Sequence, residues 1–346
     1  GTTSVDPSGN WSITLASALA EGTYSFTARV TDNSGNTGPL SAALEVIIDT
    51  TAPAAPVLIA ISDDTGSSDS DRITSDTTLI LSGTGEAGQS VELFRNTTSI
   101  GTAPINADGA WSFDYSDTVL AAGSHTFTAK TIDVAGNVSA ESATFLVEID
   151  TETPAAPEIV AIANDTGISA TDRITNVNTL VFAGVSDPLV TVTLSRNGVG
   201  IIGTTTSDAG GVWSFDYSAT ALADGFHVFT AFAGDTAGNT SATSADFTVT
   251  VDTTPPTITA QPQGGTPSIN SSFTLSVQAA DAHALTYRWH LNGNPLSDSP
   301  QHNGTQTTLL TLTAIDPAHA AGDYTVVITD TAGNATTSAP ANIVVL

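Results

Sequence analysis

The feature that most constrains the fold is a sequence block that recurs with a period of about 101 residues. The segment GNWSITL around Trp11 returns as GAWSFDYS around Trp111 and as GVWSFDYS around Trp213. A block of this length is large enough to close its own hydrophobic core, whereas half a block is not. We therefore expect a string of similar domains.

Two acidic motifs recur with the same period. Asp-x-x-Gly-Asn occurs as TDNSGN, IDVAGN, GDTAGN and TDTAGN, and Asp-Thr-x-x-Pro closes each of the first three blocks as a short linker stiffened by proline. These motifs divide the chain into four blocks, at 1–50, 51–151, 152–253 and 254–346. Because Trp11 lies so near residue 1, we expect the first block to be the C-terminal half of a truncated domain.

Within each full block, apolar and β-branched residues form short runs that alternate with period two between Gly, Asn, Asp and Pro. In the second block these runs predict seven strands, near 56–61, 77–84, 89–95, 98–105, 110–116, 125–132 and 143–149. Seven short strands in about 100 residues are typical of an immunoglobulin-like β-sandwich. No stretch has sustained helical periodicity, so we expect an all-β fold of tandem Ig-like β-sandwich domains arranged linearly.

Charge and composition exclude several classes of function. The chain has 35 Asp+Glu against 7 Lys+Arg, a net charge of −28 and no cysteine. Nucleic-acid binding requires a basic patch, and disulfides or thiolate chemistry require cysteine. No apolar run approaches the roughly 18 residues of a membrane span, and no nucleophile elbow, zinc-protease motif or phosphate loop occurs. We expect a non-enzymatic chain without nucleic-acid partners or membrane insertion, whose natural counter-charge is a cation.

The motifs together resemble a known family. In the order DTTAPxxP, DDTG, GxWSF, ALAxGxHxFTA and DxAGN, residues 1–253 resemble the bacterial Ig-like repeats of giant type-I-secreted adhesins and biofilm-associated proteins. The resemblance implies a secreted or cell-surface stalk, serving cell adhesion, that calcium holds rigid at its domain boundaries. It also implies that a host-cell or matrix receptor or glycan is bound by regions outside or at the end of this segment, and we expect a monomer.

The fourth block departs from this pattern and resembles an I-set immunoglobulin module through FTLSVQA, YRWHLNG and AAGDYTVVI. Trp289 and Tyr324 occupy the core-tryptophan and tyrosine-corner positions, and Val277 and Val326 occupy the usual cysteine positions. Packing alone must therefore stabilise this core. An alternative function follows, in which residues 254–346 recognise a glycan or protein and the other blocks only present them. An accessory region of a polysaccharide-degrading enzyme is a third candidate.

Ig topology predicts where the acidic loops meet. Strands alternate in direction, so the BC and FG loops of one domain face the AB loop and last strand of the domain before it. Calcium takes six to eight oxygen ligands, which such loops supply, whereas magnesium demands tighter octahedral geometry. The candidate calcium ligands are Asp49, Asp133 and Asn137 at the first junction, Asp63, Asp64, Asp71, Asp150, Asp187, Asp235 and Asn239 at the second, and Asp165, Asp172, Asp252, Asp281, Asp330 and Asn334 at the third.

Each of these residues also has a purely structural interpretation. Asp-x-x-Gly-Asn is compatible with an FG hairpin turn in which Asp accepts backbone N–H groups and Gly takes positive φ. The repeated tryptophans are interpreted as packing residues rather than a sugar-stacking platform. Four of the six histidines, His283, His290, His302 and His319, lie in the fourth block, but no paired ligand spacing accompanies them, so a zinc site there is not expected.

Overall fold

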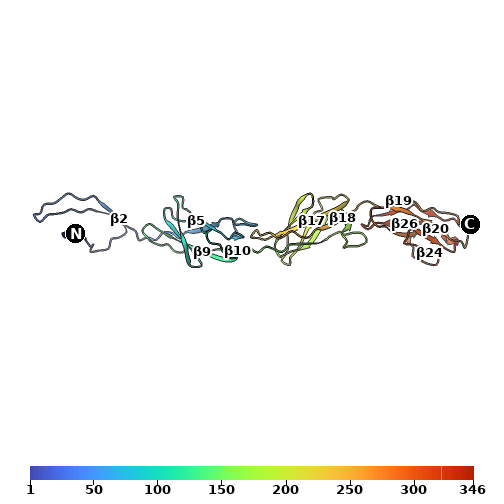
Figure 1. Cartoon of the computed structure of the whole chain (residues 1–346), viewed down its shortest axis with the longest axis horizontal. Coiled ribbons are helices and arrows are strands. Elements are labelled where there is room, and N and C mark those ends of the chain that lie inside the picture. The colour runs from blue at the N-terminus through green and yellow to red at the C-terminus, as the bar shows by residue number, and fades with distance from the viewer. Residues whose placement is uncertain (321) are drawn as a thin grey trace. The chain divides into compact units, whose positions relative to one another are not determined.

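The computed structural model describes residues 1–320 and 322–346, and Figure 1 labels the strands named below. Regular structure in the described residues is β except for one 3-10 helix, η1 (Pro317–Ala320). The prediction of an all-β fold is confirmed. No helix in the described part of the chain is long and apolar enough to cross a membrane. The chain forms two compact units, residues 1–151 with 236–238, and residues 152–235 with 239–346.

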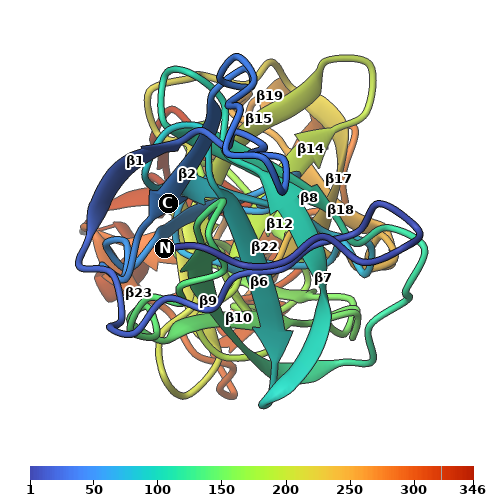
Figure 2. The same cartoon turned by 90° about the vertical axis from the view of Figure 1, so that its left-hand side faces the viewer.

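The second block folds as two sheets in the first compact unit. One sheet has the order β3 (Val57–Ile61), β5 (Ile80–Thr84), β8 (Ala110–Asp114). The other has the order β4 (Ile73–Thr74), β10 (Phe145–Ile149), β9 (Gly123–Ile132), β6 (Ser90–Arg95), β7 (Thr98–Pro104). Neighbouring strands are antiparallel, as β6 and β7 are in Figure 2, except that β4 runs parallel to β10. This arrangement is the predicted sandwich.

Strand β4 was not among the seven predicted strands. It contains only two residues, too few to carry an alternating pattern. It forms because β10 offers unpaired backbone groups: Glu148 N donates to Arg72 O at 2.9 Å, and Asp150 N donates to Thr74 O at 2.9 Å. This strand depends on tertiary pairing, which a local sequence pattern does not encode.

The inward residues of both sheets form one core that includes Trp111. The Trp111 indole lies across Gly83, its partner in the ladder. A Cβ at Gly83 would lie 2.4 Å from Trp111 Cζ2 and 1.9 Å from Val57 O, so only glycine fits there. The interpretation of the repeated tryptophan as a packing residue is confirmed at Trp111.

The third block repeats this architecture in the second compact unit. Its sheets have the orders β11 (Glu158–Ile162), β13 (Val181–Val185), β16 (Val212–Asp216), and β12 (Ile174–Thr175), β18 (Phe247–Val251), β17 (Gly225–Gly234), β14 (Thr191–Arg196), β15 (Gly200–Thr206). Trp213 is buried in its core and lies across Gly184, as Trp111 does across Gly83. The recurring sequence therefore produces a recurring packing arrangement.

Residues 1–50 contribute one antiparallel pair, β1 (Gly22–Phe26) and β2 (Leu44–Ile48). Their apolar side chains remain largely in solvent, and Trp11 is 53% exposed. The packing role of this tryptophan therefore does not appear in the first block.

The fourth block has three small sheets. They are β19 (Thr257–Ala260) with β21 (Gln278–Ala280); β20 (Phe273–Ser276), β25 (Leu309–Leu312), β24 (His302–Asn303); and β23 (Asn294–Pro295), β22 (Thr286–Leu291), β26 (Asp323–Thr329), with β27 (Ala335–Thr337) and β28 (Ala341–Asn342) both pairing β26.

Val277, Trp289 and Val326 are buried in one core, so valines fill the usual cysteine positions as predicted. Tyr324 is buried as expected of a tyrosine corner, but its hydroxyl makes no hydrogen bond, and burial raises its pKa to about 12.

Candidate functional site

The Asp-x-x-Gly-Asn segments are hairpin tips closed by the aspartate. Asp330 Oδ1 accepts the backbone N–H groups of Gly333 at 2.8 Å and Asn334 at 2.9 Å, and Oδ2 accepts Asn334 Nδ2 at 2.9 Å. Gly333 adopts φ +96°, which the turn requires. Asp133 and Asn137 form the same bonds, and the Asn137 side chain holds the pKa of Asp133 below its usual value. The structural interpretation of the motif is therefore confirmed.

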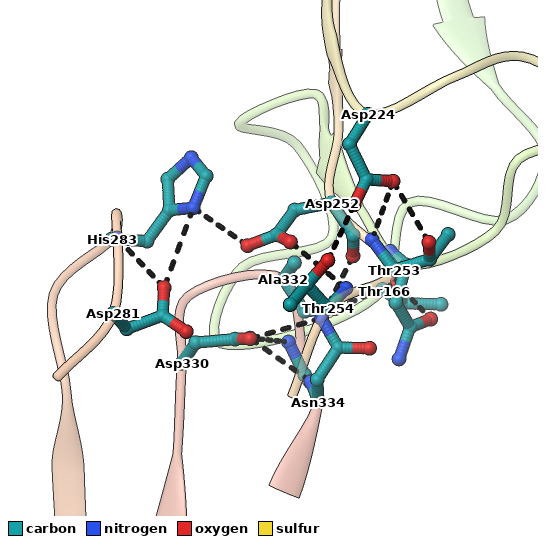
Figure 3. A network of polar contacts seen from close by, with 12 residues as sticks. Thr166, Asp224, Asp252, Thr253, Thr254, Asp281, His283, Asp330, Ala332 and Asn334 are labelled. Atoms are coloured by element: carbon teal, nitrogen blue, oxygen red, sulfur yellow. Dashed lines mark hydrogen bonds and ion pairs between the residues drawn. The ribbon is translucent and has the colours of Figure 1, made fainter. Parts of the chain in front are cut away.

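The asparagine of the motif also reaches the preceding block. Asn334 Nδ2 donates to Asp252 O at 2.7 Å (Figure 3). Asn137 Nδ2 donates to Asp49 O at 3.1 Å. In both cases the acceptor follows the last strand of the preceding block, β2 or β18. One amide group thus ties its own hairpin to the end of the preceding block. We call this contact the asparagine clamp.

A second contact supports the clamp at the third junction. Thr166 lies in the segment between β11 and β12, and its hydroxyl donates to Ala332 O at 2.9 Å (Figure 3). Beside it, Ile168 N donates to Thr331 O at 3.2 Å. The AB segment of the third block therefore meets the FG hairpin of the fourth, in the arrangement that Ig topology predicts.

Asp252, Asp281 and His283 converge at this junction (Figure 3). Asp252 Oδ2 lies 2.6 Å from His283 Nδ1, Asp281 Oδ1 lies 3.8 Å from the same nitrogen, and the three ligating atoms lie within 4.8 Å of one another. Among the described residues, this is the one group of three His, Cys, Asp or Glu side chains arranged so closely.

Local hydrogen bonds orient the members of the group. Asp252 Oδ1 accepts Thr254 N at 3.0 Å, which directs Oδ2 towards His283. Asp281 Oδ1 accepts His283 N at 2.8 Å, so the loop between β21 and β22 folds around its own carboxylate. Asp252 is only 5% exposed, and beyond the ion pair between them neither its Oδ2 nor His283 Nδ1 has a hydrogen-bond partner among the described residues.

Sequence reasoning predicted Asp252 and Asp281 but missed His283. The histidine was discounted because no second histidine stands at a metal-ligand spacing. The available signal was Asp-x-His at 281–283, in the loop already expected to face Asp252. Only the junction brings Asp252 in from the preceding block.

Asp165 and Asp172, also predicted at the third junction, lie outside this group. Asp165 Oδ2 accepts Arg173 N at 2.8 Å, and Asp172 Oδ1 accepts Ile174 N at 3.0 Å. Asp165 Oδ1 is buried without a hydrogen bond, and burial raises the pKa of this carboxyl. Their part in metal binding stays a prediction.

The residues predicted for the second junction are divided between the two compact units. Within the first unit, Asp64 accepts Arg72 N at 2.8 Å, Asp71 accepts Ile73 N at 3.0 Å, and the Asp63 carbonyl accepts the Thr74 hydroxyl. Asp150, at the end of β10, belongs to the same unit.

Within the second unit, Asp187 Oδ2 accepts Ala155 N at 2.7 Å, and Asp235 closes the hairpin tip with Asn239. Metal ligation by any of these residues stays a prediction.

The first junction brings carboxylates together without a histidine among its lining residues. A hollow of about 400 Å³ is lined by the acidic residues Glu21, Asp49, Glu86 and Asp133 together with Gln89 and with apolar and hydroxyl-bearing residues of the linker and strands. Glu21 and Glu86 were not among the predicted ligands, because neither belongs to a recurring motif. Carboxylate and amide oxygens are the ligands that calcium prefers, and calcium binding by these residues stays a prediction.

The family profile described as a bacterial Ig-like domain matches residues 1–50, 51–151 and 153–253. The chain belongs to the bacterial Ig-like domain family. A profile described as an immunoglobulin domain matches residues 255–329, so the fourth block is of a different Ig type. No curated protein sequence matches the chain.

Several solved structures are similar to this bacterial Ig-like chain. An I-band fragment of titin is 14% identical, with 85% of this chain and 100% of that chain covered and a TM-score of 0.35. Extracellular domains of Drosophila OTK are 15% identical, with 86% and 100% covered and a TM-score of 0.31. A chain of a 1.5-MDa bacterial ice-binding adhesin, described for host cell surface retention, is 21% identical, with 86% and 100% covered and a TM-score of 0.35.

Proposed function

We propose that this bacterial Ig-like chain is a non-enzymatic spacer within a large secreted or cell-surface adhesin. In this proposal, other regions of the adhesin recognise a host-cell or matrix receptor or glycan. The adhesin is exported by type I secretion and takes part in biofilm attachment. The observation that carries the proposal is the asparagine clamp, which occurs with the same donor and acceptor at the first and third junctions.

The clamp supports a spacer role because it links two blocks to each other and so limits bending between them. A short linker ending in Asp-Thr-x-x-Pro already limits bending, since proline fixes its own φ. The clamp adds a hydrogen bond from the FG hairpin to the carbonyl just before that linker. Two restraints on either side of a linker oppose hinge motion more effectively than one. Such restraints at several junctions would stiffen a long chain of these blocks.

Calcium is proposed to reinforce the first junction. Glu21, Asp49, Glu86 and Asp133 line one hollow, and their mutual repulsion is about 1 kcal/mol per pair at 4 Å in water and ~4 kcal/mol at an effective dielectric of 20. A bound cation would neutralise this repulsion. These side chains would then hold the first and second blocks against a common charge, in addition to the clamp.

Small-angle scattering on the whole chain tests the spacer proposal. Asn334→Ala and Asn137→Ala each remove one clamp, and we expect each to broaden the distance distribution and shorten the mean end-to-end distance. Chelation of calcium should add to the effect of Asn137→Ala. Unfolding of the sandwiches is monitored in parallel by far-ultraviolet circular dichroism.

Asn36→Ala is the matched control. Asn36 Nδ2 donates to Asp32 Oδ2 at 2.8 Å in the same hairpin turn, but it forms no clamp within the described residues. Its replacement should leave the scattering curve unchanged. Identical curves for the control, both clamp variants and the original chain, with and without calcium, would contradict the spacer proposal.

A further inference from the structure

We propose that Asp252, Asp281 and His283 form a binding site for a divalent transition-metal cation of the zinc class. The site lies between the end of β18 in the third block and the loop from β21 to β22 in the fourth. The proposed site is independent of the spacer function, because the three side chains lie together whether or not the chain acts as a spacer.

Burial is the first argument for a ligand. Asp252 is more than nine-tenths buried, and its Oδ2 forms an ion pair with His283 Nδ1 at 2.6 Å. Beyond this ion pair, neither atom has a hydrogen-bond partner among the described residues. Buried charged groups are stable when they are paired or bound to a metal. Asp281 offers a third ligand atom beside the pair, so one metal ion bound to all three side chains would replace this single contact with three (Figure 3).

Charge is the second argument. Asp252 and Asp281 share the site, and the fully buried Asp330 is linked to it because Asn334 Nδ2 donates both to Asp330 and to the Asp252 carbonyl. In residues 1–320 and 322–346, Asp252 and Asp281 form ion pairs with His283, and none of the three carboxylates pairs with a lysine or arginine. One imidazole therefore faces two carboxylates, and a divalent cation would balance their charge more fully.

The donor set selects the class of cation. Calcium binds through oxygen, whereas an imidazole nitrogen beside carboxylates suits zinc and its neighbours in the transition series. Ligands at 2.0–2.2 Å from a tetrahedral zinc ion are separated by roughly 3.4 Å. The observed separations of 2.6 Å and 3.8 Å lie on either side of this value, so small side-chain rotations would place all three atoms on one ion. A fourth position would be filled by water.

The fourth block contains a second histidine pair that the test must separate. His302 and His319 have ring centroids 5.6 Å apart, and the Nε2 atoms of both are buried without hydrogen bonds. This pair lacks a convergent carboxylate, since Asp316 already contacts His319 Nδ1 on the other side of the ring. It therefore offers at most two ligands.

Isothermal titration calorimetry of the whole chain with zinc chloride, after chelator treatment and dialysis, tests the site. We expect one tight zinc ion per chain at the cluster, with calcium binding there more weakly. His283→Ala should weaken this binding by about 100-fold or more, since even outer-shell changes cost 10–100-fold. Asp252→Asn, which preserves shape, should weaken it at least tenfold. Cobalt titration followed by visible absorption reports the coordination directly, and both variants should lose this signal.

His290→Ala is the matched control, because His290 lies on β22 outside the cluster and contacts Gly293 O in the turn after that strand. Its replacement should leave zinc affinity unchanged. Circular dichroism establishes that each variant is folded. Three results would overturn the proposal: no stoichiometric zinc binding, equal affinity in the original chain and folded His283→Ala, or loss of binding only when His302 and His319 are replaced. The spacer proposal would survive each of these, since it rests on the clamp.

Discussion

The first and third junctions share one hydrogen bond between blocks but differ in the side chains around it. In both, an asparagine amide donates to the carbonyl of the residue that follows the preceding block's last strand. At the first junction, four carboxylates and an amide line a hollow together with apolar residues. At the third, an imidazole joins two carboxylates at short range, and the carboxylate of Asp252 is buried.

This difference shows that the hairpin supplies the clamp, whereas the neighbouring loops supply the other polar side chains of the junction. The clamp belongs to the Asp-x-x-Gly-Asn turn, which is the same in the second and fourth blocks although these are of different Ig types. The residues proposed to bind metal differ in the loop before β6 in the second block, which has Glu86, and in the loop before β22 in the fourth, which has Asp281 and His283. A change of domain type therefore retains the clamp while changing the potential ligands beside it.

The largest expected effect is a loss of stability on replacing the hairpin aspartate, and it should be greater at the buried Asp330 than at the more exposed Asp133. Asp330→Ala removes the acceptor for three N–H groups in a fully buried setting, and unsatisfied buried donors cost about 1–3 kcal/mol each. We expect the fourth block to lose about 3 kcal/mol or more of local stability, measured by hydrogen exchange of its peptides. Asp133→Ala, in the more exposed hairpin, should have a clearly smaller effect, and Asp32→Ala serves as its control. Equal losses at Asp330 and Asp133 would contradict the comparison.

An intermediate effect tests the second contact of the third junction. Thr166→Val keeps the side-chain shape but removes the hydroxyl that donates to Ala332 O and accepts Asn176 N. We expect a loss of about 1–2 kcal/mol, because a buried carbonyl and N–H lose partners. Hydrogen exchange of the hairpin amides of Gly333 and Asn334 should accelerate. Thr171→Val, whose residue contacts only Ser169 in the same loop, should leave these amides unchanged, and similar rates in both variants would argue against the contact.

The smallest effect concerns pH. Burial raises the pKa of Asp165 above 3.8, so the folded state binds this proton more tightly than the unfolded state. Stability therefore falls as pH rises from about 3.8 through the folded pKa. Asp165→Asn should be slightly more stable than the original chain at neutral pH in the absence of metal, and the two should converge below that window.

Asp216→Asn should change the pH dependence of stability in the opposite direction. A hydrogen bond from Ser218 lowers the pKa of Asp216, so its charged form supports folding above 3.8, and that support is lost as pH falls through the lowered pKa. Thermal denaturation across pH 3 to 7 compares both variants with the original chain. A stabilising Asp216→Asn substitution at neutral pH would contradict this interpretation.

Local patterns in the sequence were sufficient for the architecture of the blocks. Alternating apolar residues predict the strands because each strand of a sandwich faces the core on one side and solvent on the other. Glycine opposite tryptophan, as at Gly83 and Gly184, and valine at the cysteine positions of the fourth block also follow from near-neighbour packing. The two-residue strand β4 escaped prediction because its partner is β10, far along the chain.

For the candidate site too, some features were predictable from the sequence and others only from the tertiary structure. The sequence alone determined that the turn motif would recur, and that Asp252 and the loop containing Asp281 would face each other, because strand direction dictates which loops share a pole. Only the tertiary structure decided that the Asn334 amide bonds to a main-chain carbonyl and that His283 turns towards Asp252. Both outcomes depend on side-chain direction across a junction between residues distant in sequence, and no local periodicity carries that information.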